Sequence, residues 1–178
     1  MSHGKVMIQA RRFSLLMSRI IGLDIAAKTG IAILEDNNVR VYYIEGSPVY
    51  QWEIIKSEIT PDSIIVIEDF SYFNAKNPFT TAILNQRLGY LYWRIVEEQI
   101  PVNKYNVNTV RKFLGITNKK AGEQKKEVRK ALCAVTRLKL TSDESDALAL
   151  LLYHIRITIN INQLSIYNFT KTKRCLET

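Results

Sequence analysis

The chain has 178 residues, a formal net charge of +8 and a hydrophobic share of 47%. These values exclude a fibrous or low-complexity protein, and they leave room for one domain with a sizeable core but not for two full domains. A basic chain of this size is often one that binds phosphate-bearing partners such as nucleic acids.

Signals for disulfides, membranes and secretion are weak. Cys133 and Cys175 are too few for a disulfide framework and lack metal-ligand spacing. The apolar run 147–153 is far shorter than a bilayer span, and residues 1–16 lack the apolar core and cleavage site of a signal peptide. We therefore expect a cytoplasmic or otherwise intracellular protein that does not act at a membrane.

The first half of the chain has the pattern of strands joined by one helix. Two β-branched apolar runs, 20–25 and 30–34, flank a short turn and predict a β-hairpin, and a third strand is predicted at 39–44. Apolar residues at helical spacing behind a proline predict a helix over 48–59. The continuous apolar run 63–70 then predicts a buried parallel strand.

The second half alternates helices with one further strand. The expected elements are a long helix at 80–98, a strand at 102–107, a short helix at 108–114, a basic helix at 122–135 and a last helix at 142–155. The whole pattern predicts an α/β domain with a mixed five-stranded sheet, three antiparallel strands followed by parallel ones, flanked by helices. The expected divisions are an N-terminal arm over 1–16 that we expect to be flexible, a folded domain over 17–157 and a tail over 158–178 whose structure the sequence leaves open.

Asp24 places a carboxylate in the first apolar strand. An ionised carboxylate costs several kcal/mol there unless it is paired or bound to a metal, although it could instead cap the turn through an Asx-type hydrogen bond. The right-handed crossover rule places the strand that ends in Glu68 beside the first strand. We therefore expect both acids at the same end of the sheet, where ligands bind in open α/β sheets.

A third acidic element opens the last helix. Ser142 is a suitable N-cap, and first-turn acids such as Asp143 and Glu144 are favoured by the helix dipole without any site. Asp146 lies one turn further, on the side of Asp143, so the two would face the acids of the sheet and need a cation between them. Oxygen-only ligand sets suit Mg²⁺ or Mn²⁺, and two such ions about 4 Å apart can hold a phosphodiester and activate a water.

In their order along the chain these motifs resemble one family. I-G-L-D at Asp24, I-E-D-F at Glu68, A-K-N at 75–77 and D-E-S-D-A-L-A at 143–149 resemble the RuvC-type Holliday junction resolvases of the ribonuclease H-like superfamily, over about 19–154. The resemblance implies a ribonuclease H-like fold in which two magnesium ions, replaceable by Mn²⁺, are bound by Asp24, Glu68, Asp143 and Asp146. It also implies a structure-selective DNA endonuclease that nicks four-way junctions and other branched DNA symmetrically as a homodimer, without a small-molecule cofactor.

Basic residues gather in 111–139, where ten lysines and arginines outnumber two glutamates. A solvated helix face is the ordinary interpretation, but the resemblance places the family's DNA contacts here. It also places Lys112 and Lys125 near the scissile phosphate as catalytic residues, and Arg111 or Lys126 would serve with a one-residue shift. The residues expected to bind DNA in this segment are Arg111, Lys119, Lys120, Lys126, Arg129 and Lys130.

The segment after Glu68 is aromatic. Phe70, Tyr72 and Phe73 are expected to stack on bases opened at the junction centre, although core packing explains one of the three at least as well. Lys76, in the A-K-N motif, is expected to join Phe70 and Phe73 in binding DNA.

Other residues are interpreted as structural. His154, two turns beyond Asp146, is expected to be a core or surface residue, and Cys133 a small buried one. For the long helix, the sequence leaves open whether Tyr90, Tyr92 and Trp93 pack in the core or at a dimer interface.

Three rival functions share parts of this pattern. The Asp, Thr and Gly around the first hairpin also resemble the phosphate loop of actin-like sugar kinases and chaperone ATPases, but these need two such domains and the chain holds one. A ribosomal-RNA-processing nuclease of the same fold would share the acids. A non-catalytic nucleic-acid-binding relative would be expected to lack some of them, and none is missing.

Overall fold

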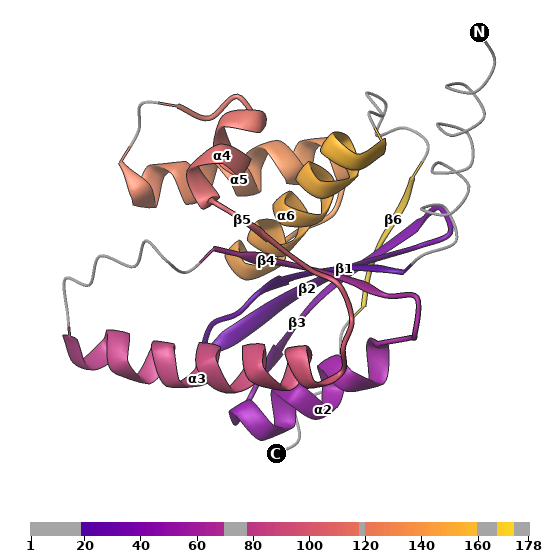
Figure 1. Cartoon of the computed structure of the whole chain (residues 1–178). Helices are drawn as coiled ribbons and strands as arrows, with labels where there is room; N and C mark the ends of the chain where they lie inside the picture. The colour runs from indigo at the N-terminus through magenta and orange to yellow at the C-terminus, as the bar shows by residue number, and fades with distance from the viewer. Residues whose placement is uncertain (1–18, 70–77, 118–119, 160–166, 173–178) are drawn as a thin grey trace, which may run out of the picture.

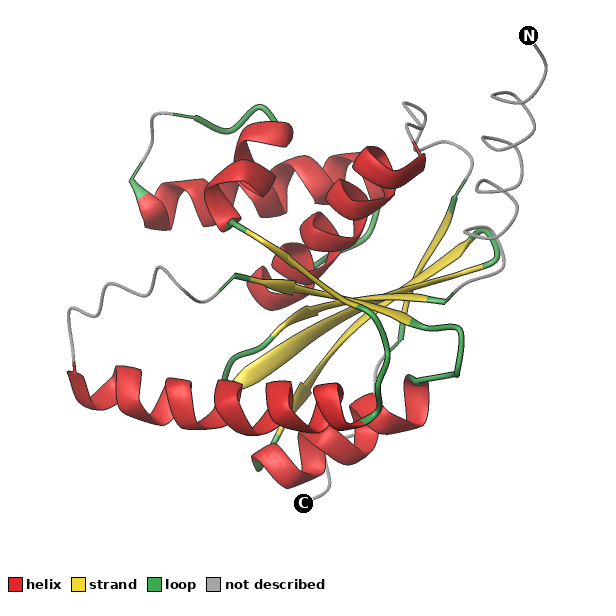
Figure 2. Ribbon diagram, viewed as in Figure 1, coloured by secondary structure: helices red, strands yellow, loops and turns green. Residues whose placement is uncertain are grey.

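The computed structural model describes residues 19–69, 78–117, 120–159 and 167–172. Within them a central sheet separates two layers of helices (Figures 1 and 2). The predicted N-terminal arm lies outside the described residues. None of the described helices is long and apolar enough to cross a lipid bilayer.

The described strands form one mixed sheet in the order β5-β4-β1-β2-β3-β6. Their bounds are β1 Ile20–Asp24, β2 Lys28–Glu35, β3 Asn38–Glu45, β4 Ile64–Glu68, β5 Val102–Tyr105 and β6 Asn168–Lys171. The first three form an antiparallel meander, whereas β4 runs parallel to β1, β5 parallel to β4, and β6 parallel to β3. The predicted α/β fold with a mixed sheet is confirmed.

The strand count differs from the predicted five because β6 comes from the tail that the sequence left open. Its four residues add to the edge of β3, and the amide of Asn168, the first of the four, donates to the carbonyl of Asn37 at 2.8 Å. Edge pairing of this kind depends on backbone groups that β3 offers, so the sequence of the tail carries little signal for it.

The described helices lie in two groups, one on each face of the sheet (Figure 1). The first pair is α2, Pro48–Glu58, and α3, Pro78–Glu97; the second group is α4, Val107–Phe113, α5, Ala121–Thr136, and α6, Ser142–Ile159. Alternate strand residues divide between the two cores: Ile21 and Leu23 pack toward α2 and α3, whereas Ile20 packs in the cluster that contains α6.

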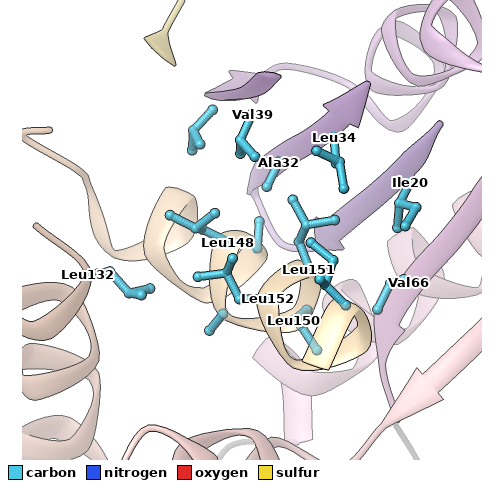
Figure 3. Close-up of a cluster of buried hydrophobic side chains, with 14 of the residues drawn as sticks. Ile20, Ala32, Leu34, Val39, Val66, Leu132, Leu148, Leu150, Leu151 and Leu152 are labelled. Carbon is cyan, nitrogen blue, oxygen red and sulfur yellow. The ribbon is translucent and has the colours of Figure 1, made fainter. Parts of the chain in front are cut away.

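Helix α6 is the centre of the second core. Figure 3 shows its leucines, Leu148 and Leu151 among them, grouped with side chains of the sheet such as Ala32 and Leu34. Burial of one such leucine contributes about 1.5–3 kcal/mol. This packing fixes α6 against β1 and β2, so the acids in its first turns have a defined position relative to the sheet.

Candidate active site

Asp24 and Glu68 end neighbouring parallel strands. Leu23 of β1 is paired with Ile67 of β4, so the two acids that follow lie side by side at one end of the sheet. Gly22 and Val66, two residues earlier, belong to the face that packs on α6, and the period of two therefore directs Asp24 and Glu68 to that same face. The predicted adjacency of the two strands is confirmed.

Two glycines allow α6 to approach this face closely. A β-carbon on Gly22 would lie 2.6 Å from the carbonyl oxygen of Ala147, and one on Gly30 would overlap the carbonyl of Asp143. Gly30 is the direct strand partner of Asp24. The backbone of α6 thus rests on the sheet beside Asp24, which brings the acids of the helix to those of the strands.

The first turn of α6 is held by a reciprocal cap between Thr141 and Glu144. The amide of Thr141 donates to the Glu144 carboxylate at 2.7 Å, and the amide of Glu144 donates to the Thr141 hydroxyl at 3.3 Å. The expected N-cap, Ser142, is instead the first helical residue, because the threonine before it makes the paired bonds of a capping box. Glu144 is buried in this role, whereas Asp143 and Asp146 keep partial exposure.

One pocket joins the strands to three helices. It is lined by the charged residues Asp24, Glu68, Arg111 and Asp146, with apolar walls from Val107, Val110, Val128, Ala149 and Leu150. Asp143 is not among the lining residues, but its charge acts on Asp24. The structure thus gathers at one place acids that lie far apart in the chain.

The surroundings of three of the acids disfavour the charged carboxylate. Burial and the nearby charge of Asp146 raise the pKa of Asp24 well above its usual value, and Asp24 is only 8% exposed. Burial likewise raises the pKa of Glu68, although Arg111 opposes the shift, and it raises the pKa of Asp143 although Lys125 opposes the shift. Raised carboxyl pKa values of this kind mark a site that would gain stability from an added cation.

Lys125 of α5 supplies one positive charge to the site. Its ammonium lies 3.1 Å from a carboxylate oxygen of Asp146. Burial lowers the pKa of Lys125, but the charges of Asp146 and Asp24 outweigh burial and raise it. The ammonium therefore stays charged beside the acids at neutral pH.

Arg111 and Lys112 are placed differently, although they are neighbours on α4. Arg111 is 8% exposed, lines the pocket and donates to the side-chain oxygen of Gln124 at 3.0 Å. Its buried Nε has no hydrogen-bond partner in the described part of the chain. Lys112 is exposed and is not among the pocket-lining residues. Of the two positions that the sequence left open, the structure puts Arg111 beside the acids.

The donor chemistry of the site fits hard divalent cations. Asp24, Glu68, Asp143 and Asp146 offer only carboxylate oxygens, which suit Mg²⁺ or Mn²⁺ better than Zn²⁺. Within the described ranges, no three acidic, imidazole or thiol side chains converge closely enough to surround one ion in this conformation. The ion pair of Lys125 with Asp146 provides part of the missing positive charge.

The remaining basic candidates lie on an exposed surface. Lys126, Arg129 and Lys130 are exposed along α5, and Lys120 is exposed at the residue before it. Lys119, Phe70, Tyr72, Phe73 and Lys76 lie outside the described residues. The predicted DNA contacts of these residues therefore stay predictions.

The sequence did not predict the partner of His154. The ring nitrogen Nδ1 is 2.6 Å from the hydroxyl of Tyr105, and this bond links α6 to the end of β5. His154 is buried, as expected for a core residue, and burial lowers its pKa to about 4. Because Tyr105 and Glu68 are strand partners, the bond also ties α6 to the strand end that carries Glu68.

The aromatic residues of α3 divide between core and surface. Tyr90 and Tyr92 are partly buried and pack against the core between the sheet and this helix, whereas Trp93 is 64% exposed. Val96, three residues further, is exposed on the same helix. Core packing thus accounts for the two tyrosines and does not account for Trp93.

Comparison with known proteins identifies the family. The family model described as crossover junction endodeoxyribonuclease RuvC matches residues 52–154, more than half of the chain and a range that includes Glu68, Asp143 and Asp146. No curated protein sequence gives a significant match.

Solved structures show the same fold. Thermus thermophilus RuvC in complex with Holliday junction substrate has 17% identity and a TM-score of 0.57, with 80% of this chain and 97% of that chain covered. Another structure of Thermus thermophilus RuvC has 18% identity and a TM-score of 0.53, with 76% and 92% covered. The yeast mitochondrial Holliday junction resolvase has 14% identity and a TM-score of 0.51, with 89% and 87% covered. With its family model matched over α2 to α6 and its fold shared with these proteins, the chain belongs to the RuvC family of crossover junction endodeoxyribonucleases.

Proposed function

We propose that this protein is a structure-selective DNA endonuclease that resolves four-way junctions and other branched DNA by magnesium-dependent hydrolysis of phosphodiester bonds. The observation that carries the proposal is the pocket in which Asp24, Glu68 and Asp146 lie with Arg111, in a chain of the RuvC family. The structure of a fold relative in complex with Holliday junction substrate supports the choice of branched DNA.

The acids would hold the metal. Asp24, Glu68, Asp143 and Asp146 would ligate two Mg²⁺ ions, and Mn²⁺ would substitute. When bound, such ions activate a water molecule and stabilise the leaving oxygen of a phosphodiester. The raised pKa values of Asp24, Glu68 and Asp143 support this assignment, because burial and, to a smaller extent, repulsion from neighbouring acids disfavour their charged forms, which divalent cations would stabilise.

The basic residues divide into two groups. Lys125 and Arg111 adjoin the acids and would offset the negative charge that develops on the phosphate during cleavage. Lys120, Lys126, Arg129 and Lys130 lie on the exposed side of α5 or just before it and would bind the DNA backbone without reading sequence. Lys112 is assigned to this second group on account of its exposure.

Symmetric nicking requires two active sites, and we assign the active form to a homodimer. The exposed Trp93 and Val96 on α3 support a contact through this helix, which lies on the face of the sheet opposite α6 (Figure 1). We assign the nuclease domain to 17–157 with β6 added at its edge.

The test is a panel of labelled substrates of equal length: a four-way DNA junction, a three-way junction, a linear DNA duplex and a structured RNA, each with Mg²⁺ or with EDTA. The expected result is Mg²⁺-dependent cleavage of the junctions, paired nicks on opposite strands of the four-way junction, and little cleavage of the linear duplex. Preferential cleavage of RNA would replace this proposal with the RNA-processing alternative. Binding of junctions without any cleavage in Mg²⁺ or Mn²⁺ would assign the chain to non-catalytic relatives.

A further inference from the structure

The C-terminal strand β6 places one charged side chain against the helix that carries Asp143 and Asp146. Lys171 is paired with Val41 of β3, and its ammonium reaches the start of α6. There it donates to the carboxylate of Glu144 at 2.8 Å and to the carbonyl of Lys139 at 2.8 Å. Two segments that are distant in the chain are thereby joined by charge-assisted bonds.

Glu144 needs these donors because it is 1% exposed. Its Oε2 accepts from the ammonium of Lys171 and from the amide of Thr141, and the second of these bonds is part of the cap of α6. Lys171 keeps 26% of its side-chain exposure, so its own charge is partly solvated. Removal of Lys171 would leave a buried carboxylate without its counter-charge, whereas removal of the Glu144 charge would leave a lysine that can turn to water.

The position of Glu144 connects this ion pair to the active site. Glu144 follows Asp143 directly and precedes Asp146 by two residues, and the three share the first turns of one helix. The backbone of Asp143 is in close contact with Gly30. This contact limits how far the first turn of α6 can shift, and any shift of the turn also moves its acids. A displacement of Glu144 would therefore also displace Asp143 and Asp146.

We propose that Lys171 is a positioning residue for the metal site: through Glu144 it holds the first turn of α6, so that Asp143 and Asp146 keep the geometry that binds divalent cations. The inference rests on the proposed function, because it takes Asp143 and Asp146 to be metal ligands. It makes β6 part of the support of the active site, although the strand lies at the far edge of the sheet from β4 and β5.

The test measures Mn²⁺ binding to the full chain by titration calorimetry, without DNA, in wild type, Lys171→Met, Glu144→Gln and the double variant. Lys171→Met should weaken Mn²⁺ binding about tenfold, at the lower end of the effect of outer-shell partners. Glu144→Gln should stay within about twofold of wild type, because the glutamine oxygen still accepts from Thr141. In the Glu144→Gln background the further change Lys171→Met should cost less than about twofold, since the two residues act as one unit.

Two further variants serve as controls. Lys171→Arg keeps the charge and should restore Mn²⁺ affinity to near the wild-type value. Lys56→Met removes an exposed lysine that pairs with Glu98 on the opposite helical layer, and it should leave affinity unchanged. If Lys171→Met does not fold by circular dichroism, Lys171→Gln, with a neutral polar side chain, gives the same comparison.

The outcomes separate this inference from the proposed function. An equal loss of affinity from Lys171→Met in both backgrounds, or no loss in either, would overturn the role of Lys171 through Glu144. A wild-type protein that binds Mn²⁺ and shows the predicted coupling but cleaves no DNA would overturn the proposed function alone. A wild-type protein that cleaves junctions yet shows no coupling would overturn only the role of Lys171, and absence of Mn²⁺ binding in wild type would overturn both.

Discussion

Gly30 of β2 lies directly against the backbone carbonyl of Asp143, so closely that a β-carbon at this position would overlap it. Gly30 is also the strand partner of Asp24. One glycine therefore sets the separation between an acid of the sheet and an acid of the helix. This close approach requires a residue without a side chain at position 30.

Gly30→Ala should displace the start of α6. Overpacking of this kind costs about 1–3 kcal/mol, which corresponds to a fall in Tm of about 2–4 °C for each kcal/mol in a domain of this size. Cleavage should fall further than the loss of folded protein explains, because Asp143 moves with the helix. Thermal unfolding and single-turnover cleavage, the latter measured below Tm, check the two effects.

Gly89→Ala is the matched control. Gly89 lies within α3, and an added β-carbon meets no atom within 4 Å. Alanine there should gain about 0.5–1 kcal/mol from its better helix propensity and leave cleavage unchanged. If Gly30→Ala instead left cleavage unchanged and did not lower stability, as expected for Gly89→Ala, the close contact between α6 and β2 would be wrong.

Lys125→Ala should act on the rate of cleavage. Its ammonium pairs with Asp146 at 3.1 Å, and the loss of a charge next to the reacting phosphate should lower the single-turnover rate by more than about tenfold. Junction affinity, measured in Ca²⁺, should change little, because most affinity comes from the wider basic surface. A variant that binds more weakly but cleaves at the wild-type rate at saturation would show that Lys125 contributes to DNA affinity, as part of that surface, and not to the rate of cleavage.

Arg111 and Lys112 allow a comparison of two adjacent basic residues. Arg111→Gln should lower the rate more than Lys112→Gln, because Arg111 lines the pocket while Lys112 is exposed. Single-turnover rates of both variants in Mg²⁺ give the comparison, with circular dichroism to verify folding. The reverse order of rates would favour the lysine that the family resemblance first suggested.

His154 should give the protein a pH-dependent stability. Its folded-state pKa of about 4 lies below the ordinary value of 6.5, so the unfolded chain binds the extra proton between these values. The contribution of His154 is therefore fully present above pH 6.5 and is lost as the pH falls toward 4, by at most about 1.4 kcal/mol per pH unit. Urea unfolding of wild type and His154→Gln between about pH 4.5 and 7.5 measures it.

The difference in unfolding free energy between wild type and His154→Gln isolates the contribution of the histidine. Asp24, Glu68 and Asp143 have raised pKa values and contribute with the opposite sign, since the stability they give is present at low pH and is lost as the pH rises through their folded pKa values. These acids are present in both proteins. Parallel stability curves for wild type and His154→Gln would show that His154 does not titrate as a buried neutral ring.

The exposed lysines of α5 should control the salt dependence of binding. Replacement of Lys126 and Lys130 by alanine should lower affinity for junctions and linear duplexes alike, and it should flatten the slope of log K against log salt by roughly one unit for each lysine–phosphate interaction that is removed. Fluorescence anisotropy at several salt concentrations gives the slope. Lys56→Ala, on the opposite helical layer, should leave the slope unchanged.

Most of the fold could be predicted because its signals are local. The runs of β-branched residues predicted β1 to β4, and helical spacing predicted α2, α3, α5 and α6 within a few residues. The strand β6 could not be predicted, because four residues at a sheet edge depend on an unpaired neighbour and show little hydrophobic alternation. The cap of α6 was assigned one residue late because Ser142 and Thr141 are both good N-caps, and only the bond to Glu144 distinguishes them.

The acids of the candidate site and Lys125 were named from the sequence, whereas most of the contacts that support them were not. Asp24 and Glu68 stand out as carboxylates at the ends of apolar strands, and parallel pairing then brings them together. For Arg111 the sequence left a choice with Lys112 open, and Lys171 and the bond between Tyr105 and His154 leave no mark at all, because these roles depend on contacts between distant segments. The role of such a residue depends on which distant residue the fold places next to it.

The central claim is tested most directly by single-turnover cleavage of a four-way DNA junction, labelled on each strand in turn, by wild type and by Asp24→Asn. Wild type should make paired nicks in Mg²⁺ and none in EDTA. Asp24→Asn should lose more than about a hundredfold in rate, beyond the usual effect of outer-shell residues, while it binds the junction in Ca²⁺ as tightly as wild type or more tightly, because a negative charge is removed. Cleavage by Asp24→Asn at the wild-type rate, or wild-type cleavage that persists in EDTA, would contradict the account.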